Sequence, residues 1–211
     1  MLPFNELLLF AFAALILVIS PGPNMIYLIS RSITQGKKAG LISLGGVICG
    51  FLFHIVLVSF GLTALLLTIP FAYLLLKTTG VMYLLYLAYQ AVQSKSNNPF
   101  VSKTRLSIDK PSKLFSIGFL TNVLNPKVAF FYLSFFPQFI KPQYGDIMTQ
   151  SLQLGITQIA VSFSVNALIV LTAARLSAFL GEKPFWLRIQ QWFMASVLTS
   201  MAIKMAFTKA K

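Results

Sequence analysis

Ser20-Pro21-Gly22-Pro23-Asn24 stands near the end of the first apolar run of this 211-residue chain, where a membrane-spanning helix would otherwise continue. A second break, Asn125-Pro126-Lys127, lies about 103 residues later, inside the fourth apolar run. Proline lacks a backbone N–H and clashes with the carbonyl four residues earlier, so each break leaves backbone groups without helical partners. Such groups survive at membrane depth only where protein or a water-filled cavity surrounds them. Two breaks, one in each half, predict the substrate site of a transporter.

The composition of the chain is typical of a membrane protein. Hydrophobic residues make up 57% of it and charged residues 10%, which is more apolar surface than a soluble domain could bury. The net charge of +13 comes from basic residues in short loops between apolar runs, which is a pattern of membrane anchoring. The expected partner is therefore a lipid bilayer, and no nucleic-acid partner is expected. One cysteine, one histidine and no catalytic motif predict no enzyme, no cofactor and no metal site.

Six apolar runs are long enough to cross a bilayer, which takes about 20 residues. We therefore predict a single-domain, all-α protein over residues 1–211 with six transmembrane helices, at Phe4–Ile29, Ala39–Leu67, Phe71–Val92, Leu114–Ile140, Ile147–Leu176 and Phe185–Phe207. Three spans in each half make the second half enter the membrane from the opposite side. The halves, about 1–93 and 114–211, are thus predicted to be inverted repeats with helices 1 and 4 broken by proline, joined by a basic cytoplasmic linker at about 94–113.

Positive charge is distributed unequally between the two sides of the predicted spans. The loops after spans 1, 3 and 5 carry eleven Lys and Arg residues, and the opposite side carries four. The positive-inside rule therefore places both termini outside the cytoplasm. The basic C-terminal tail argues the other way, because it would be cytoplasmic if the sixth segment lay along the interface.

The breaks offer groups for both charges of a zwitterion. The prolines of the first break leave the carbonyls of Leu17 and Ile19 without helical donors, and Gly22 lets another group approach the backbone closely. Pro126 does the same for the carbonyl of Asn122. Freed carbonyls can hold an ammonium group, and the start of the next half-helix can hold a carboxylate. The alternative is that these prolines are ordinary kinks, which membrane helices tolerate.

Lys127 is the basic residue placed deep in a predicted span. A charge at the bilayer centre costs about 2.5–3.5 kcal/mol on insertion scales, so such a lysine indicates function. It could attract a substrate carboxylate, or it could only neutralise a helix end or reach water. Asn24 and Asn125 are expected to line the pathway, whereas Gln158 and Asn166 are expected to hydrogen-bond across helices. The predicted substrate-binding residues are Pro21, Gly22, Pro23, Asn24, Asn122, Asn125, Pro126 and Lys127.

His54 lies in the middle of the second predicted span. Histidine titrates near neutral pH, so His54 is the candidate for coupling transport to a proton. The alternative is a buried neutral histidine with one hydrogen bond. The same span carries small residues at helical spacing that are predicted to allow close helix contact: Gly36, Gly40, Gly46 and Gly50.

Several motifs occur in a characteristic order: Ser20-Pro21-Gly22-Pro23-Asn24-Met25, Leu76-Lys77 with Gly80-Val81-Met82-Tyr83-Leu84, Gly118-Phe119-Leu120-Thr121-Asn122, Asn125-Pro126-Lys127 and Phe136-Pro137-Gln138-Phe139. Over nearly its whole length the chain resembles the LysE/RhtB superfamily of bacterial amino-acid exporters. The resemblance implies export of small amino acids, driven by the proton or ion gradient, in the bacterial cytoplasmic membrane and as a homodimer. The family's basic-amino-acid exporters carry an acidic residue near the start of span 2. None occurs between Gly40 and Gly50, so neutral substrates such as threonine, homoserine or leucine are expected.

Three other functions stay open at the level of sequence. The first is a passive channel for small solutes, which would show flux without uphill accumulation. The second is an exporter of basic amino acids. The third is a membrane-embedded partner protein without transport, in which the prolines would be kinks only.

Overall fold

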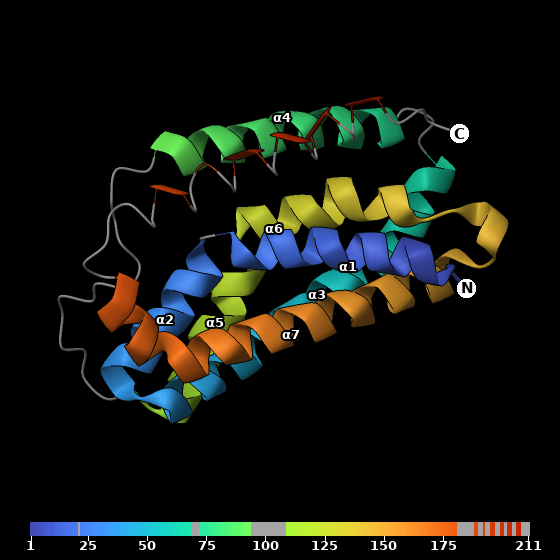
Figure 1. Ribbon diagram of the computed structural model, residues 1–211. Helices are drawn as coiled ribbons and strands as arrows, with labels where there is room; N and C mark the ends of the chain where they lie inside the picture. Colours follow the sequence, from blue (N-terminus) through green and yellow to red (C-terminus); the bar gives the residue numbers. More distant parts are fainter. Residues whose placement is uncertain are drawn as a thin grey trace.

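The computed structural model describes residues 1–20, 22–68, 72–93 and 109–180, and scattered helical residues between 188 and 207. Within these residues it contains helices and turns and no strand, which confirms the all-α class there (Figure 1). The α-helices are α1 (Phe4–Ile19), α2 (Pro23–Gln35), α3 (Lys37–Thr68), α4 (Ala72–Gln93), α5 (Pro111–Val123), α6 (Pro126–Phe130) and α7 (Ile147–Leu180). The π-helical turn η1 (Phe131–Phe135) and the 3₁₀ turns η2 (Phe136–Phe139) and η3 (Pro142–Tyr144) connect α6 to α7.

Two of these helices are long and apolar enough to cross a membrane singly, through Lys37–Gly61 of α3 and Ile147–Ala173 of α7. Two bent helix pairs can each cross as one broken span, which gives up to four spans among the described residues. The predicted third span corresponds to α4. Most of the predicted sixth span, and most of the linker, lie outside the described residues, so the count of six stays a prediction.

Both bends fall at the predicted proline breaks. The chain turns by 58° between α1 and α2 and by 47° between α5 and the segment that begins with α6. Pro23 and Pro126 each stand at the first positions of the new helix, where the missing N–H has no helical partner to lose. The first and fourth predicted spans therefore each consist of two helices. The first predicted span continues to Gln35 instead of ending at Ile29.

The two bent pairs run in opposite directions along the molecule (Figure 1). At the end where α2 finishes and α5 begins, the side chain of Gln35, the last residue of α2, donates to Asp109 at 2.9 Å. At the end where α1 begins, the amino group of Met1 donates to the carbonyl of Tyr144 at 2.8 Å. Each bent pair thus finishes beside the start of the other, which is the placement that an inverted repeat requires.

Glycine lets α3 and α5 pack backbone against backbone. A Cβ atom on Gly46 would lie 2.0 Å from the carbonyl oxygen of Phe115, and one on Gly118 would lie 2.3 Å from the carbonyl oxygen of Ser43. No side chain fits at either position. The predicted packing role of Gly46 is therefore confirmed, and this contact fixes α5 beside α3 on the way to the second break.

The other predicted glycines differ in their roles. Cβ atoms on Gly40 and Gly50 would meet Ser32 Oγ at 2.1 Å and Asn122 Cβ at 2.6 Å, so both are packing positions. Gly36 has no such neighbour within 4 Å and is not a packing residue. It adopts a φ of 86° in the turn between α2 and α3, a conformation that glycine accepts without strain.

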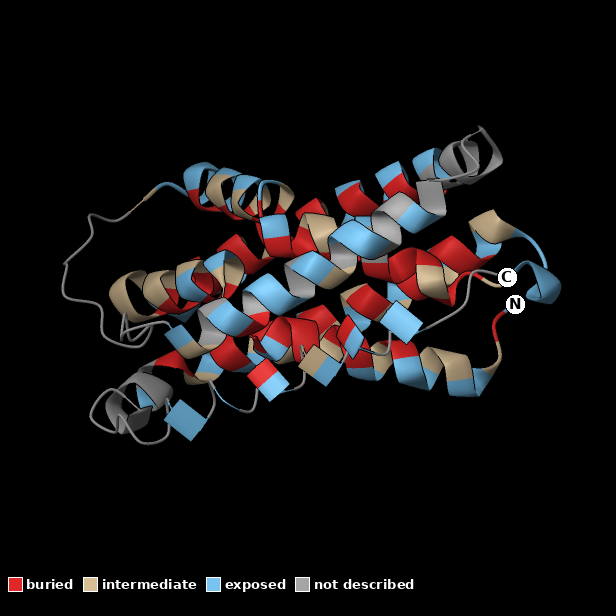
Figure 2. Ribbon diagram, turned by 90° about the horizontal axis from the view of Figure 1, so that it is seen from above, coloured by how far each residue is buried: buried red, intermediate tan, exposed pale blue. Residues whose placement is uncertain are grey.

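The surface of the bundle is apolar where a lipid bilayer would surround it. Large side chains such as Phe12 and Ile156 are 61% and 67% exposed. Buried residues face the interior of the bundle and exposed residues face outward (Figure 2). Several aromatic side chains pack together in the interior, with Phe10 in edge contact with Phe136 and Phe139. An apolar outside with a packed inside is what a membrane solvent requires.

Candidate functional site

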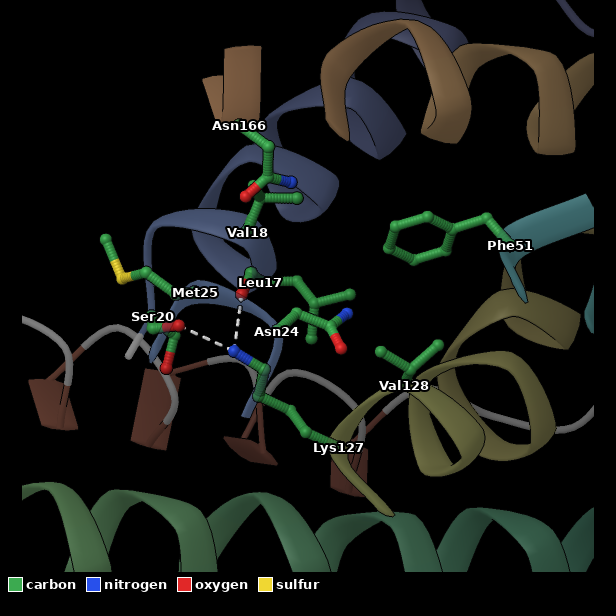
Figure 3. Close-up of a pocket in the computed structure, with 9 residues that line it drawn as sticks. All are labelled: Leu17, Val18, Ser20, Asn24, Met25, Phe51, Lys127, Val128 and Asn166. Carbon is green, nitrogen blue, oxygen red and sulfur yellow. Dashed lines mark hydrogen bonds between the residues drawn. The ribbon is translucent and has the colours of Figure 1, made fainter. Parts of the chain in front are cut away.

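Lys127 reaches from the second break to the first. Its Nζ atom donates to the carbonyl oxygen of Leu17 at 2.9 Å and to that of Ser20 at 2.6 Å (Figure 3). The side chain is buried, with 9% of the residue exposed. The sequence predicts Leu17 correctly as a free acceptor, but the second acceptor is Ser20 and not Ile19. A cation of one half of the chain is therefore bound by freed carbonyls of the other half.

The end of α1 suits a cation for two reasons. The carbonyls at the C-terminus of a helix carry the negative end of its dipole. The carbonyl of Leu17 has no helical donor because residue 21 is a proline, although Pro21 itself lies outside the described residues. Gly22 follows in extended conformation, and a Cβ atom there would lie 3.1 Å from Lys127 Nζ. Glycine thus leaves room for the lysine side chain beside the break.

Asn125 caps the helix that carries Lys127. Its Oδ1 atom accepts from the backbone N–H of Lys127 at 3.0 Å and so caps the start of α6. A side-chain cap of this kind satisfies a backbone donor that the helix cannot. The Nδ2 atom of Asn125 is buried and has no hydrogen-bond partner in the described part of the chain. Asn125 does not line the cavity described below, and its place on the transport pathway stays a prediction.

Asn122 and His54 form a second polar group beneath the break. His54 Nε2 lies 3.4 Å from the carbonyl oxygen of Asn122, and its ring stacks on Tyr132 with centroids 5.3 Å apart. That carbonyl also accepts from the backbone N–H of Asn125 at 3.0 Å, so the prediction that Pro126 leaves it free is wrong. The turn at residues 122–125 supplies the donor. Both polar atoms of the Asn122 side chain are buried without a partner among the described residues.

A small cavity of about 20 Å³ adjoins the ammonium group of Lys127. Five helices contribute to its wall, through Leu17, Val18, Ser20, Asn24, Met25, Phe51, Lys127, Val128 and Asn166 (Figure 3). A volume of this size holds about one water molecule. Of the predicted site residues, Asn24 and Lys127 line it. Asn122 and Asn125 do not, while Pro23 and Pro126 act through the helices that they begin.

Asn166 is a polar residue of the cavity that the sequence analysis assigns to contacts between helices. Its Nδ2 atom donates to the carbonyl of Ser162 in its own helix at 2.9 Å. Gln158 likewise donates to Ser162 Oγ of the same helix at 3.1 Å. Within the described part of the chain, neither side chain makes the predicted bond to another helix. In the sequence, each of these residues is a single amide side chain in an apolar run, and this pattern does not indicate the direction in which the amide points.

Ion pairs close the two ends of the molecule. Where α2 finishes, Asp109 binds Arg31 at 2.5 Å and Lys113 at 2.6 Å, and it accepts from Gln35 at 2.9 Å. These donors hold the pKa of the Asp109 carboxyl below its usual range, with the hydrogen bond from Lys113 as the largest cause. Where α1 begins, Glu6 binds Lys141. The sequence gives no sign of the pairs Arg31–Asp109 and Glu6–Lys141, because their members lie 78 and 135 residues apart in the chain.

The model of the family described as LysE type translocator matches residues 15–209. The chain belongs to the LysE family. This LysE-family chain is 33% identical over 165 residues to the homoserine/homoserine lactone efflux protein of Salmonella typhimurium, which covers 78% of this chain and 79% of that relative. It is 25% identical over 193 residues to the leucine efflux protein of Salmonella choleraesuis, with 92% and 91% covered. No solved structure matches it.

Family membership confirms the resemblance found in the motifs. The chain is a member of a transporter family and, with its long apolar helices, a multi-pass membrane protein. Its relatives are amino-acid efflux proteins, so an amino-acid exporter is supported. No group of three His, Cys, Asp or Glu residues that could hold a metal occurs in the described part of the chain.

Proposed function

We propose that this LysE-family protein exports small neutral amino acids, or close derivatives of them, across the bacterial cytoplasmic membrane. It works by alternating access and is driven by the proton or ion gradient. The observation that carries the proposal is the bond of Lys127 to the carbonyls of Leu17 and Ser20, because it brings a cation and two strong acceptors together at the crossing of two broken helices. Such a pair can receive both the carboxylate and the ammonium of an amino acid.

The charge of the cavity wall favours a neutral side chain on the substrate. Lys127 supplies a positive charge, and no carboxylate among the described residues lines the cavity. A substrate with a second positive charge would therefore be buried without a partner, which is costly. The walls formed by Met25, Phe51 and Val128 are apolar, and Asn24 offers a buried Oδ1 atom without a partner among the described residues. The substrates in the names of the two relatives, homoserine or its lactone and leucine, have uncharged side chains.

The arrangement of the bent pairs supports alternating access. They run antiparallel and cross at the site, so rocking one against the other would expose the site to each side in turn. We infer that the end with Arg31 and Lys113 faces the cytoplasm, since basic residues concentrate in that set of loops, and that both termini lie outside. The full six-span inverted repeat and the homodimer belong to the same proposal.

The test is efflux from cells preloaded with a labelled mixture of amino acids. Cells with the native chain, with Lys127→Ala and without the protein are compared, with and without an uncoupler, at matched membrane expression. Uphill release of one or a few neutral amino acids, abolished by the uncoupler and by Lys127→Ala, is expected. Downhill release that ignores the uncoupler would indicate a passive channel, and release of lysine or arginine a basic exporter. No protein-dependent release of any amino acid would contradict the proposal.

A further inference from the structure

The ammonium group of Lys127 occupies the place that the proposed function gives to the substrate's ammonium. Its Nζ atom is 2.9 Å and 2.6 Å from the two carbonyl oxygens at the end of α1. These distances are those of charge-assisted hydrogen bonds. The carbonyls of Leu17 and Ser20 cannot hold a second ammonium group at the same time, because two like charges would then meet in a buried site. The lysine and the substrate therefore compete for one position.

The size of the site also indicates that the lysine and the substrate compete for one position. The cavity beside Lys127 has a volume of about 20 Å³, enough for one water molecule and far too small for an amino acid. Gly22 lies against the lysine stem, where even a Cβ atom would come within 3.3 Å of Cε. Room for a substrate thus requires the Lys127 side chain to leave the carbonyls.

No described side chain offers Lys127 a carboxylate as an alternative partner. The neighbouring helices present Asn24 and Met25 from α2, Phe51 from α3 and Asn166 from α7, all of them uncharged. On α4, which passes beside α6, the charged residue is Lys77, whose side chain lies outside the described part. A buried ammonium without a carboxylate depends on its hydrogen-bond acceptors. When it leaves the carbonyls, the carboxylate of an incoming amino acid is the partner that fits it.

We propose that Lys127 is a tethered placeholder for the substrate's ammonium group. In the empty carrier it binds Leu17 and Ser20 and keeps the crossing of the broken helices closed. An entering amino acid displaces it, binds the two carbonyls with its own ammonium, and receives the freed lysine on its carboxylate. This inference rests on the proposed function and adds to it how the empty carrier returns without a substrate.

The placeholder separates two modes of transport. Net efflux requires the empty carrier to change sides, and this step needs the lysine to fill the ammonium position. Exchange of labelled for unlabelled substrate uses only the loaded carrier, in which the substrate itself fills that position. Loss of the lysine removes the partner of the substrate carboxylate in both modes, which saturating substrate offsets, but it removes the placeholder from net efflux alone. Net efflux should therefore fall more than exchange. A residue that only bound the carboxylate would harm both modes equally.

The experiment uses the purified full-length protein in liposomes, with labelled homoserine and labelled leucine as probes at saturating concentration. Net efflux into substrate-free buffer and exchange against the same substrate are measured for the native chain, Lys127→Met and the exposed control Lys38→Met. For Lys127→Met the ratio of net efflux to exchange should fall by about tenfold or more, the effect of disfavouring one state of a two-state carrier. Lys38→Met should keep the native ratio.

Gly22→Ala gives an independent test in case Lys127→Met folds poorly. The extended backbone at Gly22 accepts alanine, and the added Cβ atom would lie 3.1 Å from Nζ, so it crowds the lysine and weakens its hold on the carbonyls without removing its charge. Its ratio should fall in the same direction. If the ratio of net efflux to exchange is unchanged in both variants, whether or not both rates fall, the placeholder is overturned and the proposed exporter function stands. If the native protein moves neither probe in either mode, export of homoserine and leucine and the placeholder inferred for them are both overturned.

Discussion

Glu6 and Asp109 are 103 residues apart in the chain, the same separation as the prolines that begin α2 and α6, and each carboxylate binds a cation that is distant in the sequence. Glu6, in the first turn of α1, binds Lys141 beyond the second bent pair. Asp109, just before α5, binds Arg31 near the end of the first bent pair. The start of α1 and the end of α2 lie at opposite ends of the molecule (Figure 1), so the two ion pairs join the halves of the structure at opposite ends.

Reversing the charge at one of these ends should impair transport, and swapping the pair should restore it. Asp109→Arg places a cation beside Arg31 and Lys113, so the end where α2 meets α5 is pushed apart. The export rate should fall severalfold. The double variant Arg31→Asp/Asp109→Arg rebuilds the pair, and it should recover most of the native rate. Initial efflux rates at equal expression measure this, and a double variant no better than the single one would show that the pair itself does not matter.

The same carboxylate predicts where the stability of the protein depends on pH. Hydrogen bonds from Lys113 and Gln35, and then the charges of Lys113 and Arg31, lower the pKa of Asp109 in the folded protein. A lowered folded pKa contributes stability above the unfolded value of about 3.9, and this is lost as pH falls through the folded value. Asp109→Asn should therefore lower the unfolding temperature equally at about pH 5 and about pH 8, and by less below about pH 4. A deficit that changes between the two higher pH values would contradict this account.

Local features of the sequence predict much of the fold. The predicted span Ala39–Leu67 lies within α3, and the predicted span Ile147–Leu176 lies within α7. Apolar length and proline act over a few residues, so both can be recognised without the fold. The predicted helix through residues 131–139 is wrong in detail, because a π turn and a 3₁₀ turn replace it. The cause is Pro137, because it has no backbone N–H to donate to the preceding turn and its ring clashes with the carbonyl of that turn.

The candidate site could be predicted only in its parts. The freed carbonyl of Leu17 and the deep position of Lys127 both follow from the sequence. That the two bind each other does not, because the fold must bring residues 110 positions apart into contact. The position of Asn166 in the cavity wall likewise depends on a contact between residues that are distant in the sequence. Long-range contacts of this kind depend on how α1, α6 and α7 cross, which no local pattern specifies.

Adjacent glycines in α3 offer a matched test of the helix contact. Gly46→Ala would bring its Cβ atom to 2.0 Å from the backbone of α5, whereas a Cβ atom on Gly45 would meet the Phe115 ring at an ordinary 3.7 Å. Overpacking of this kind costs about 1–3 kcal/mol, and a backbone obstacle puts Gly46→Ala at the upper end. Thermal unfolding in detergent should show a clear loss for Gly46→Ala and little change for Gly45→Ala. Equal unfolding temperatures would mean that α3 and α5 are not packed this closely.

Removing the cap of α6 should weaken both the fold and the site. Asn125→Ala loses the acceptor for the backbone N–H of Lys127, which costs about 1 kcal/mol in a typical helix. Asn125→Ser keeps a capping oxygen and should retain most of the stability and export rate. Unfolding temperature and efflux rate are measured together for both variants. Similar behaviour of alanine and serine would show that Asn125 acts through something other than its cap.

His54 is the residue that we propose carries the coupled proton, and its predicted signature differs from that of Lys127. It stacks on Tyr132 beside the Asn122 carbonyl and does not line the cavity, so replacing it should leave the substrate position intact. His54→Gln keeps a polar side chain of similar length but cannot titrate. We expect it to lose uphill accumulation while retaining downhill net efflux and exchange. Lys127→Met should instead lose downhill net efflux as well. The three assays on reconstituted protein, with a proton gradient imposed or absent, separate these outcomes. Uphill export that persists in His54→Gln would show that His54 is a buried structural histidine and that another group carries the coupling.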